Sequence, residues 1–216
     1  MSARKKDSDP LTRERIVEAA MRVIDSDGIE ALSMRRLGDE LGVNPMAAYH
    51  YVPNKAALYD LVVDAVMASV DMGAVDQTAS VKERLKQSAR AYRAAILAHP
   101  RAIPVFATRS LRSVTAIRPI EPFAGVLFEA GLTPTEVLAT IDTIAVLILG
   151  GALGHYNSEL QSEAGEQREF DPLPAEEFPN MSRVLAEGCF LGFEQEFEFG
   201  LDVLVRGLRI SSHPES

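Results

Sequence analysis

Several side chains suited to touching nucleic acid crowd into one short stretch of the chain. Met46, Ala47, Tyr49, His50 and Tyr51 fall within six consecutive positions. This set is too aromatic for an ordinary solvated surface and too polar for a core. Such side chains can donate to phosphate oxygens and read base edges, so the stretch is a candidate nucleic-acid interface. The alternative is a helical hairpin that merely packs.

Residues typical of helix ends indicate the helices that hold this stretch. Ser33 can cap a helix that Gly42 ends, because the residue after a helix often needs a positive φ. Asn44 can cap a second helix with Pro45 at its first position, where a missing N–H costs nothing. Pro53 cannot continue that helix. The spacing predicts a helix-turn-helix whose second helix, Pro45 to Tyr51, presents its side chains to the DNA major groove.

The surrounding sequence resembles the N-terminal DNA-binding domain of the TetR family of bacterial transcriptional regulators. The resemblance lies in GIEALS, RRLGDELGV and AAYHYVPNKAAL, which match the family pattern in order. The chain departs from that pattern at Gly38, Ala48 and Tyr51, where Ala, Leu, and His or Phe are usual. We expect one set of residues to contact bases: Arg35, Asn44, Met46, Ala47 and His50. Pro45 opens the helix that carries most of them. A second set should mainly contact phosphates: Tyr49, Tyr51 and Lys55.

Charge is distributed unevenly along the 216 residues, whose net charge is −9. Residues 1–60 hold nine basic and ten acidic side chains, so they are near neutral. The excess of acid therefore lies in the remainder, and this polarity would orient the molecule on a polyanion. Few phosphates can be neutralised, which argues against tight nonspecific DNA binding at physiological salt.

Two helices in the second half of the chain are richer in apolar residues than one small domain requires. A long helix over about Pro134 to Gln161 is apolar on every face from Ile144 to Leu153, so we expect burial all round. The segment EFEFGLDVLVRGL looks like the C-terminal region of the tetracycline-repressor branch, in which the long helix and the last helix of each subunit form a four-helix dimer bundle. The predicted interface comprises Ile148, Gly150, Gly154, Phe197, Leu201, Leu204 and Leu208.

Catalysis is not indicated, since no metal-binding histidine pair, nucleophile elbow or phosphate-cradling loop occurs. A small-molecule pocket between helices is the better interpretation. Its candidate residues are Tyr92, His99, Phe106, Arg109, Phe123, His155 and Asn157. In the tetracycline branch a His and a Glu support a magnesium-bound drug, and their aligned positions here are Val105 and Gly154. We therefore expect no metal, no cofactor, and a mostly apolar or aromatic effector.

Taken together, these features predict an all-α protein with a three-helix helix-turn-helix domain over residues 1–54. Residues 55–216 would form an effector-binding and dimerisation domain, with a linking helix over about 55–72. The N-terminus lacks a signal peptide and the longest apolar run is too short to span a bilayer, so we expect a soluble cytoplasmic protein with no membrane partner. The predicted function is a homodimeric repressor released from a palindromic operator by a small molecule. An activator of the same fold, or a helical carrier or enzyme without DNA binding, remains an alternative.

Overall fold

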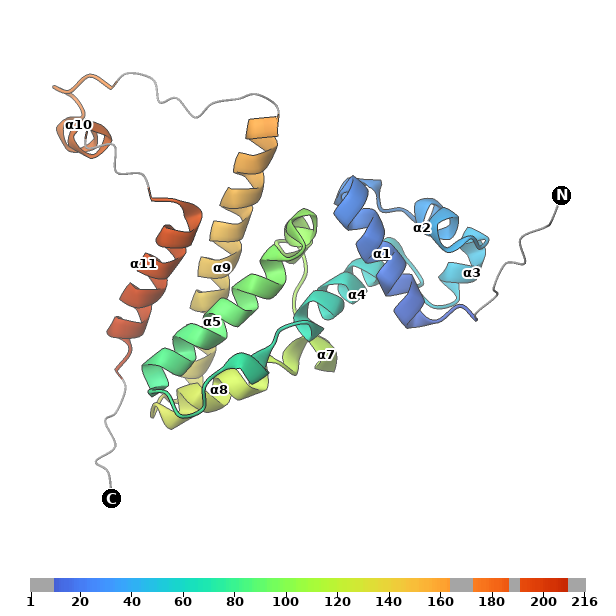
Figure 1. The fold of residues 1–216 in the computed structure, drawn as a ribbon, viewed down its shortest axis with the longest axis horizontal. Helices are drawn as coiled ribbons and strands as arrows, with labels where there is room; N and C mark the ends of the chain where they lie inside the picture. Colours follow the sequence, from blue (N-terminus) through green and yellow to red (C-terminus); the bar gives the residue numbers. More distant parts are fainter. Residues whose placement is uncertain (1–9, 164–172, 187–190, 210–216) are drawn as a thin grey trace. The chain divides into compact units, whose positions relative to one another are not determined.

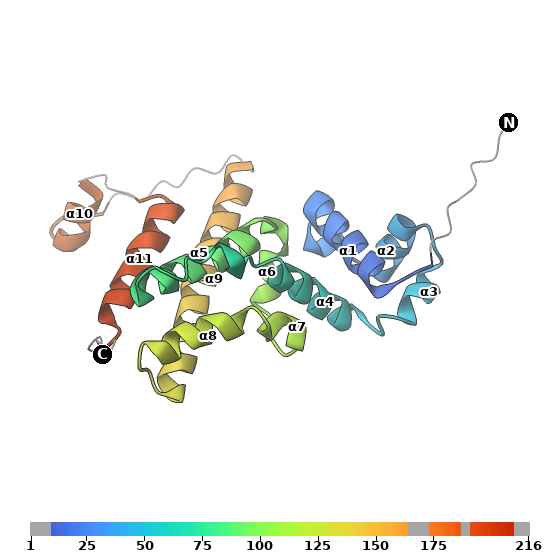
Figure 2. The ribbon, with the colours of Figure 1, turned by 60° about the horizontal axis from the view of Figure 1, so that its bottom comes forward.

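The computed structural model describes residues 10–163, 173–186 and 191–209. Regular structure in these residues is helical throughout, without a strand, which confirms the predicted all-α class. The helices gather into two compact units (Figures 1 and 2). Unit 1 contains residues 10–72 and 94–121, and unit 2 contains residues 73–93 and 122–209. The predicted boundary between residues 54 and 55 stays a prediction.

Unit 1 is built on a bundle whose core is formed by fully buried aliphatic side chains. Its helices are α1 (Arg13–Asp27), α2 (Met34–Leu41), α3 (Pro45–Tyr49), α4 (Lys55–Ala68), α6 (Ile103–Phe106) and α7 (Val114–Ile117), with 3-10 turns at Ile29–Ala31 and Pro100–Ala102. Its fully buried side chains, with no exposed surface, include Ile16, Ile24, Leu37 and Leu58. Helices α2 and α3 pack on each other, and α1 packs on both α2 and α4.

Local end signals position these helices as the sequence predicts. The Ser33 hydroxyl accepts from the Arg36 backbone N–H at 3.1 Å, and Asn54 Oδ1 accepts from the Ala57 N–H at 2.8 Å. Helix α4, however, ends at Ala68 and not near Met72 as predicted. The Ser69 hydroxyl donates to the Val66 carbonyl, and the backbone N–H of Ser69 turns back to the same carbonyl at 3.1 Å. A serine that bonds to the preceding turn ends the helix before the glycine is reached.

The last residues of α5 (Val81–Leu97), from residue 94, belong to unit 1, and so does the segment that follows it up to residue 121. Polar contacts fasten it to α1 and α4. His99 Nδ1 lies 3.0 Å from Asp25 Oδ1, and Arg109 Nε donates to Asp60 Oδ1 at 2.7 Å. The Ser113 hydroxyl donates to Asp64. Residues 99–113, more than thirty positions after α4, are thus part of the body that carries the helix-turn-helix.

Unit 2 is organised around the longest helix, α9 (Pro134–Glu163). It also contains residues 81–93 of α5, most of α8 (Ile120–Glu129), α10 (Pro179–Ala186) and α11 (Phe193–Gly207). A capping box starts α9: Glu136 Oε2 accepts from the Thr133 N–H at 2.8 Å, and the Thr133 hydroxyl accepts from the Glu136 N–H at 3.4 Å. Helix α10 begins at Pro179.

Helices α9 and α11 lie side by side through small residues. A Cβ at Gly154 would come within 3.0 Å of the Phe193 ring, and one at Gly200 within 2.8 Å of Leu147. Because α11 covers one side of α9 only, the expectation of burial all round is wrong for the single chain. Ile148 is 3% exposed, but Val146 is 71% exposed.

The expectation that no apolar stretch is long enough to span a bilayer is wrong by length and composition, since residues 134–158 of α9 meet both requirements. Buried or interface helices of soluble proteins share those properties. Its packing beside α11 and the helix-turn-helix in the same chain favour that second interpretation.

Candidate nucleic-acid interface

The turn between α2 and α3 sets the direction in which α3 leaves the body of unit 1. Gly42 has φ 66° and ψ 31°, a left-handed conformation that glycine adopts without a Cβ penalty. The Val43 N–H donates to the Gly38 carbonyl at 2.9 Å, which closes the turn. Asn44 Oδ1 then accepts from the Met46 N–H at 2.9 Å, with Pro45 in the first turn of α3.

Helix α3 has one face in the core and one face in solvent. Ala48 and, just beyond the helix, Val52 are fully buried and hold α3 against unit 1. Met46, Tyr49 and Tyr51 are 66%, 42% and 44% exposed, and His50 and Asn44 are exposed as well. A helix that presents large aromatic and polar groups on its outer face is suited to a groove rather than to free solvent.

The two adjacent arginines of α2 differ in their availability to a ligand. Arg36 donates to Asp27 Oδ2 at 3.0 Å and to Glu40 Oε2 at 3.4 Å, and the bond from Arg36 lowers the pKa of Asp27. Arg35 is exposed and makes no ion pair with any residue in the part of the chain that the structure describes. Arg35 is therefore the arginine of the pair that is available to a phosphate or a base.

Lys55 marks the start of α4, where backbone N–H groups also point outward. Its ammonium lies 5.3 Å from the centre of the Tyr59 ring, and the side chain is exposed. A phosphate placed there can accept from both the lysine and the helix end.

Gly38 is explained by the neighbouring turn. A Cβ at this position would lie 3.0 Å from Pro45 Cγ and 3.0 Å from the Val43 carbonyl oxygen. The proline ring at the start of α3 thus occupies the space that the alanine usual in the family would need. Sequence reasoning recorded the two residues separately and did not connect them, because their proximity depends on how α2 and α3 pack.

The candidate effector residues fall into both units. In unit 2, the Tyr92 ring is 8% exposed and lies 6.0 Å from Phe123 between ring centroids, and His155 lies 5.2 Å from Phe193. The Tyr92 hydroxyl is buried without a hydrogen-bond partner among the described residues, and burial raises its pKa. Asn157 is exposed on α9.

The other three candidates lie in unit 1 and are already occupied there. His99 contacts Asp25 and Arg109 pairs with Asp60, while Phe106 is a buried core residue. That all seven candidates line one ligand pocket stays a prediction.

The predicted dimer residues divide by exposure. Ile148, Phe197 and Leu201 are buried within the chain, Leu204 and Leu208 are half-buried, and Gly150 is exposed. Sequence reasoning did not single out the apolar side chains that reach solvent on these helices: Leu138 and Val146 on α9, and Phe199 and Val203 on α11. The sequence spacing could have identified two of them. Phe199 and Val203 are four residues apart on α11, so they share a helix face other than the inward face of Phe197 and Leu201.

Comparisons with known proteins agree with this architecture. A family model described as bacterial regulatory proteins, tetR family, matches residues 16–62, and one described as tetracyclin repressor-like, C-terminal domain, matches residues 75–211. The HTH-type transcriptional repressor DrrR1 of Streptomyces coeruleorubidus is 31% identical, over 93% of this chain and 78% of the relative. The class C tetracycline repressor protein of Escherichia coli is 26% identical, over 92% of this chain and 90% of the relative.

A solved structure shares the fold along nearly the whole chain. Apo ActR from Streptomyces coelicolor superposes with a TM-score of 0.80 at 28% identity, over 93% of this chain and 96% of that one. ActR has also been solved in complex with actinorhodin. Three findings lead to the same assignment. Two family models match consecutive parts of the chain, a known repressor is more than 30% identical, and the outer face of α3 is exposed. The chain belongs to the TetR family of bacterial regulatory proteins, with a tetracycline-repressor-like C-terminal domain, and is a DNA-binding transcriptional repressor and not an enzyme.

Proposed function

We propose that the protein acts as a homodimer that places its two α3 helices in successive major grooves of a pseudo-palindromic operator. The half-sites would lie about one helical turn, ~34 Å, apart or slightly more. The observation that carries this proposal is the exposed outer face of α3, with Met46 66% exposed, on a helix that Ala48 and Val52 anchor in the core.

The residues of this face have distinct roles in the proposal. Arg35, Asn44, Met46, Ala47 and His50 read bases, and Pro45 sets the start of the helix. Tyr49, Tyr51 and Lys55 hold phosphates. The exposure of both tyrosines and the helix end beside Lys55 support this division.

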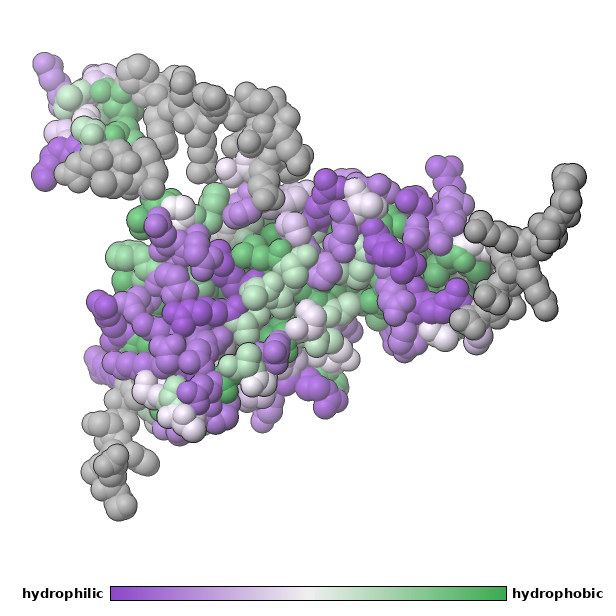
Figure 3. All heavy atoms as spheres, in the orientation of Figure 1, coloured by the Kyte–Doolittle hydropathy of each residue, from purple (hydrophilic) through white to green (hydrophobic). Residues whose placement is uncertain are grey.

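The dimer in this proposal forms through α9 and α11 of each subunit. The outward apolar side chains Leu138, Val146, Phe199 and Val203 make the contacts between subunits, together with the half-buried Leu204 and Leu208. On the face of unit 2 seen in Figure 3, hydrophobic residues reach the surface among hydrophilic ones. Ile148, Gly154, Phe197 and Leu201 hold α11 on α9 within each subunit, and exposed Gly150 leaves room for the partner.

A small-molecule effector that enters unit 2 releases the repressor from DNA in this proposal. The complex of ActR with actinorhodin supports a small-molecule ligand for a protein of this fold. The buried Tyr92 hydroxyl would hydrogen-bond to the effector, because a buried polar group without a partner is costly. Phe123 and His155 would add ring contacts to a mostly apolar or aromatic ligand, bound without a metal or other cofactor. The site of action would be the cytoplasm.

Selection of bound sequences from a random duplex pool tests the DNA-binding part. An enriched palindrome with the spacing above is the expected result, and no enrichment by a folded protein would contradict it. The palindrome then serves as the probe for compounds that release DNA. For a compound found in this way, Tyr92→Phe should weaken release and leave operator affinity unchanged, whereas unchanged release would remove Tyr92 from the effector site.

A further inference from the structure

The first two turns of α4 place an aromatic ring beside the lysine that begins the helix. Lys55 and Tyr59 are four residues apart, so their side chains lie on one face of α4. The Lys55 ammonium lies 5.3 Å from the centre of the Tyr59 ring, which is within the range of a cation–π contact. Because side chains on a helix lean toward its N-terminus, the Tyr59 ring reaches back to the turn that Lys55 opens.

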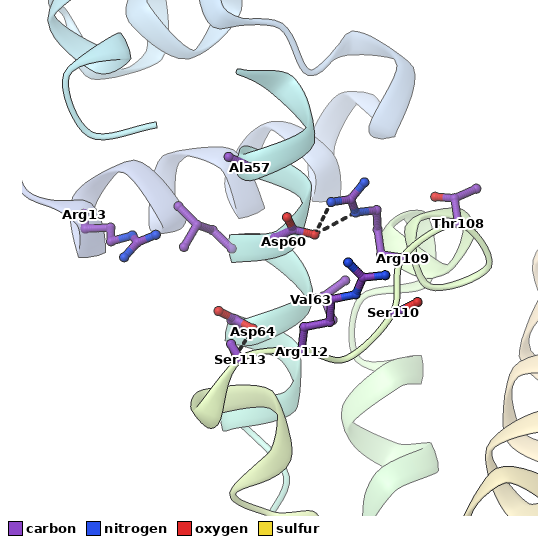
Figure 4. Close-up of a pocket in the computed structure, with 11 residues that line it drawn as sticks. Arg13, Ala57, Asp60, Val63, Asp64, Thr108, Arg109, Ser110, Arg112 and Ser113 are labelled. Atoms are coloured by element: carbon purple, nitrogen blue, oxygen red, sulfur yellow. Dashed lines mark hydrogen bonds and ion pairs between the residues drawn. The ribbon is translucent and has the colours of Figure 1, made fainter. Parts of the chain in front are cut away.

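No carboxylate of α4 neutralises this lysine. Lys55 is exposed and makes no ion pair with any of the residues that the structure describes. Asp60 is bound by Arg109, whose Nε donates to Asp60 Oδ1 at 2.7 Å, and Asp64 accepts from the Ser113 hydroxyl. Figure 4 shows Asp60 turned toward Arg109 in a polar cleft that α1, α4 and the segment after α6 line. Both acidic side chains of α4 are thus engaged with that segment.

A ring and a carboxylate differ in what they leave of an ammonium for a further partner. A carboxylate would neutralise the charge and occupy N–H donors. The ring attracts the ammonium through its quadrupole and leaves the charge in place. The N–H groups that point away from the ring can therefore donate to a phosphate, beside the backbone N–H groups of the first turn of α4.

We propose that Tyr59 is a positioning residue for DNA binding, which holds the Lys55 ammonium at the open end of α4 for an operator phosphate. This inference rests on the proposed phosphate contact of Lys55. A free lysine gives up motion about four side-chain bonds when it binds, and that ordering weakens the complex. Because the ring restricts the side chain before DNA arrives, less ordering remains to be done. Tyr59 acts through Lys55 and not by a DNA contact of its own.

Titrations of the full chain with its selected palindrome, at several salt concentrations, test this role. Tyr59→Leu should lower operator affinity roughly fivefold, since each subunit of the dimer loses one ordered lysine. The slope of log K against log salt should stay as in the wild type, because the charge of Lys55 remains. Tyr59→Phe keeps the ring and should bind within about twofold of the wild type.

A double-variant cycle separates positioning from a structural role of the half-buried Tyr59 side chain. In the Lys55→Gln background, Tyr59→Leu should cause no further loss of affinity, because no ammonium is left to position. Thermal unfolding of each variant without DNA shows whether the fold is kept. Tyr59→Met, with a flexible apolar side chain, replaces Tyr59→Leu if that variant does not fold.

A measurement without DNA tests the contact itself. Protons that lie over an aromatic ring resonate upfield, so the Cε protons of Lys55 should be shifted upfield in the wild type and in Tyr59→Phe. In Tyr59→Leu they should return to the ordinary lysine position. Proton–carbon correlation spectra of protein with labelled lysine measure the shift, and Lys55→Gln assigns the resonance.

Three results would overturn the proposal. A wild type without the upfield shift would show that the contact does not form in solution. Equal losses of affinity in Tyr59→Phe and Tyr59→Leu would assign the effect to the hydroxyl. A loss from Tyr59→Leu that is the same with and without Lys55 would make the ring a structural residue.

The same titrations distinguish this inference from the proposed function on which it rests. If Lys55→Gln weakens operator binding and Tyr59→Leu does not, the phosphate contact stands and the positioning role is wrong. If Lys55→Gln binds the operator with the affinity and salt slope of the wild type, the phosphate contact is wrong and the positioning role falls with it.

Discussion

Single side chains decide how α3 and α4 meet DNA. Tyr49 is 42% exposed and Lys55 stands at the open end of α4. In our proposal both hold phosphates, but they differ in charge. Only a charged contact releases a counterion from the DNA, so the two residues should be separable by their salt dependence.

For the dimer, Lys55→Gln should reduce the slope of log K against log salt by about 0.9 for each subunit. Tyr49→Phe should lower operator affinity at least tenfold and leave the slope unchanged, because it removes from each subunit an uncharged hydroxyl that donates to a phosphate. Operator titrations at several salt concentrations measure both effects. Lys82→Gln, an exposed lysine of unit 2, is the control and should change neither quantity. A slope that changes for Tyr49→Phe would show that the hydroxyl acts by another route.

Gly38 and Pro45 form a second pair of residues whose effects depend on each other, because the Pro45 ring fills the space beside Gly38. Gly38→Ala should destabilise the protein by roughly 1–2 kcal/mol, since its new Cβ meets Pro45 Cγ and the Val43 carbonyl at 3.0 Å. In Gly38→Ala/Pro45→Ser the cost should be smaller than the sum of the two single changes, because the ring contact is gone. Chemical unfolding of the four proteins of this cycle measures the coupling. If the free-energy costs of the two single changes add up in the double variant, the Val43 carbonyl alone would account for the cost of Gly38→Ala.

At the scale of whole elements, ion pairs align α11 with α5 inside unit 2. Lys86 pairs with Asp202, Arg90 with Glu198 and Arg93 with Glu194, so the chain positions rise on α5 as they fall on α11. Arg90 is the bidentate member, with Nε and Nη2 each 2.8 Å from an oxygen of Glu198. This ladder favours one antiparallel register of α11, the helix whose outer face we assign to the dimer.

The stability that Glu198 contributes should depend on pH. The bond from Arg90 lowers the pKa of Glu198 below its ordinary value. Its contribution is therefore present above the unfolded pKa of about 4.3 and is lost as the pH falls through the lower folded pKa. Glu198→Gln should cost roughly 1 kcal/mol or less at pH 7, since both partners are partly exposed, and the cost should disappear once the pH is below the folded pKa of Glu198.

Unfolding of the wild type and Glu198→Gln at a series of pH values checks this. Glu196→Gln changes a neighbouring exposed carboxylate that has no ion pair among the described residues, and it should show no such pH-dependent cost. A cost for Glu198→Gln that persists in acid would point to packing and not to charge.

For the whole molecule, our proposal makes operator binding depend on subunit association, which would bring two recognition helices together. Phe199 and Val203 are 66% and 55% exposed on α11, and Val146 is 71% exposed on α9. Contiguous exposed apolar side chains of this kind mark association surfaces. In our proposal they close the dimer, and operator affinity depends on them without any direct DNA contact.

Phe199→Asp should convert the dimer to monomers and abolish operator binding at nanomolar protein, because it places a charge in an apolar contact. Phe128→Asp, at a phenylalanine of α8 that is 51% exposed, is the matched control and should remain dimeric. Sedimentation velocity measures the association, and circular dichroism confirms that the subunit folds. A Phe199→Asp protein that still sediments as a dimer would move the interface elsewhere.

The sequence alone determined the features that depend on neighbouring residues. Ser33, Gly42, Asn44 and Asn54 define the ends of α2, α3 and α4, because caps and a left-handed glycine act within one turn of the chain. The family resemblance rests on the same local patterns, and the comparisons confirm it. The start of α9 follows in the same way from Thr133 and Glu136.

The tertiary structure alone decided which residues meet across the sequence. Helical periodicity marks α9 and α11 as apolar, but only their packing shows that Ile148 faces inward and Val146 outward. No local signal places residues 99–113 on α1 and α4, brings Arg112 to the same cleft as Arg13, or sets Gly38 against Pro45. These contacts join segments far apart in the chain or on different helices, and the angle at which helices cross decides them.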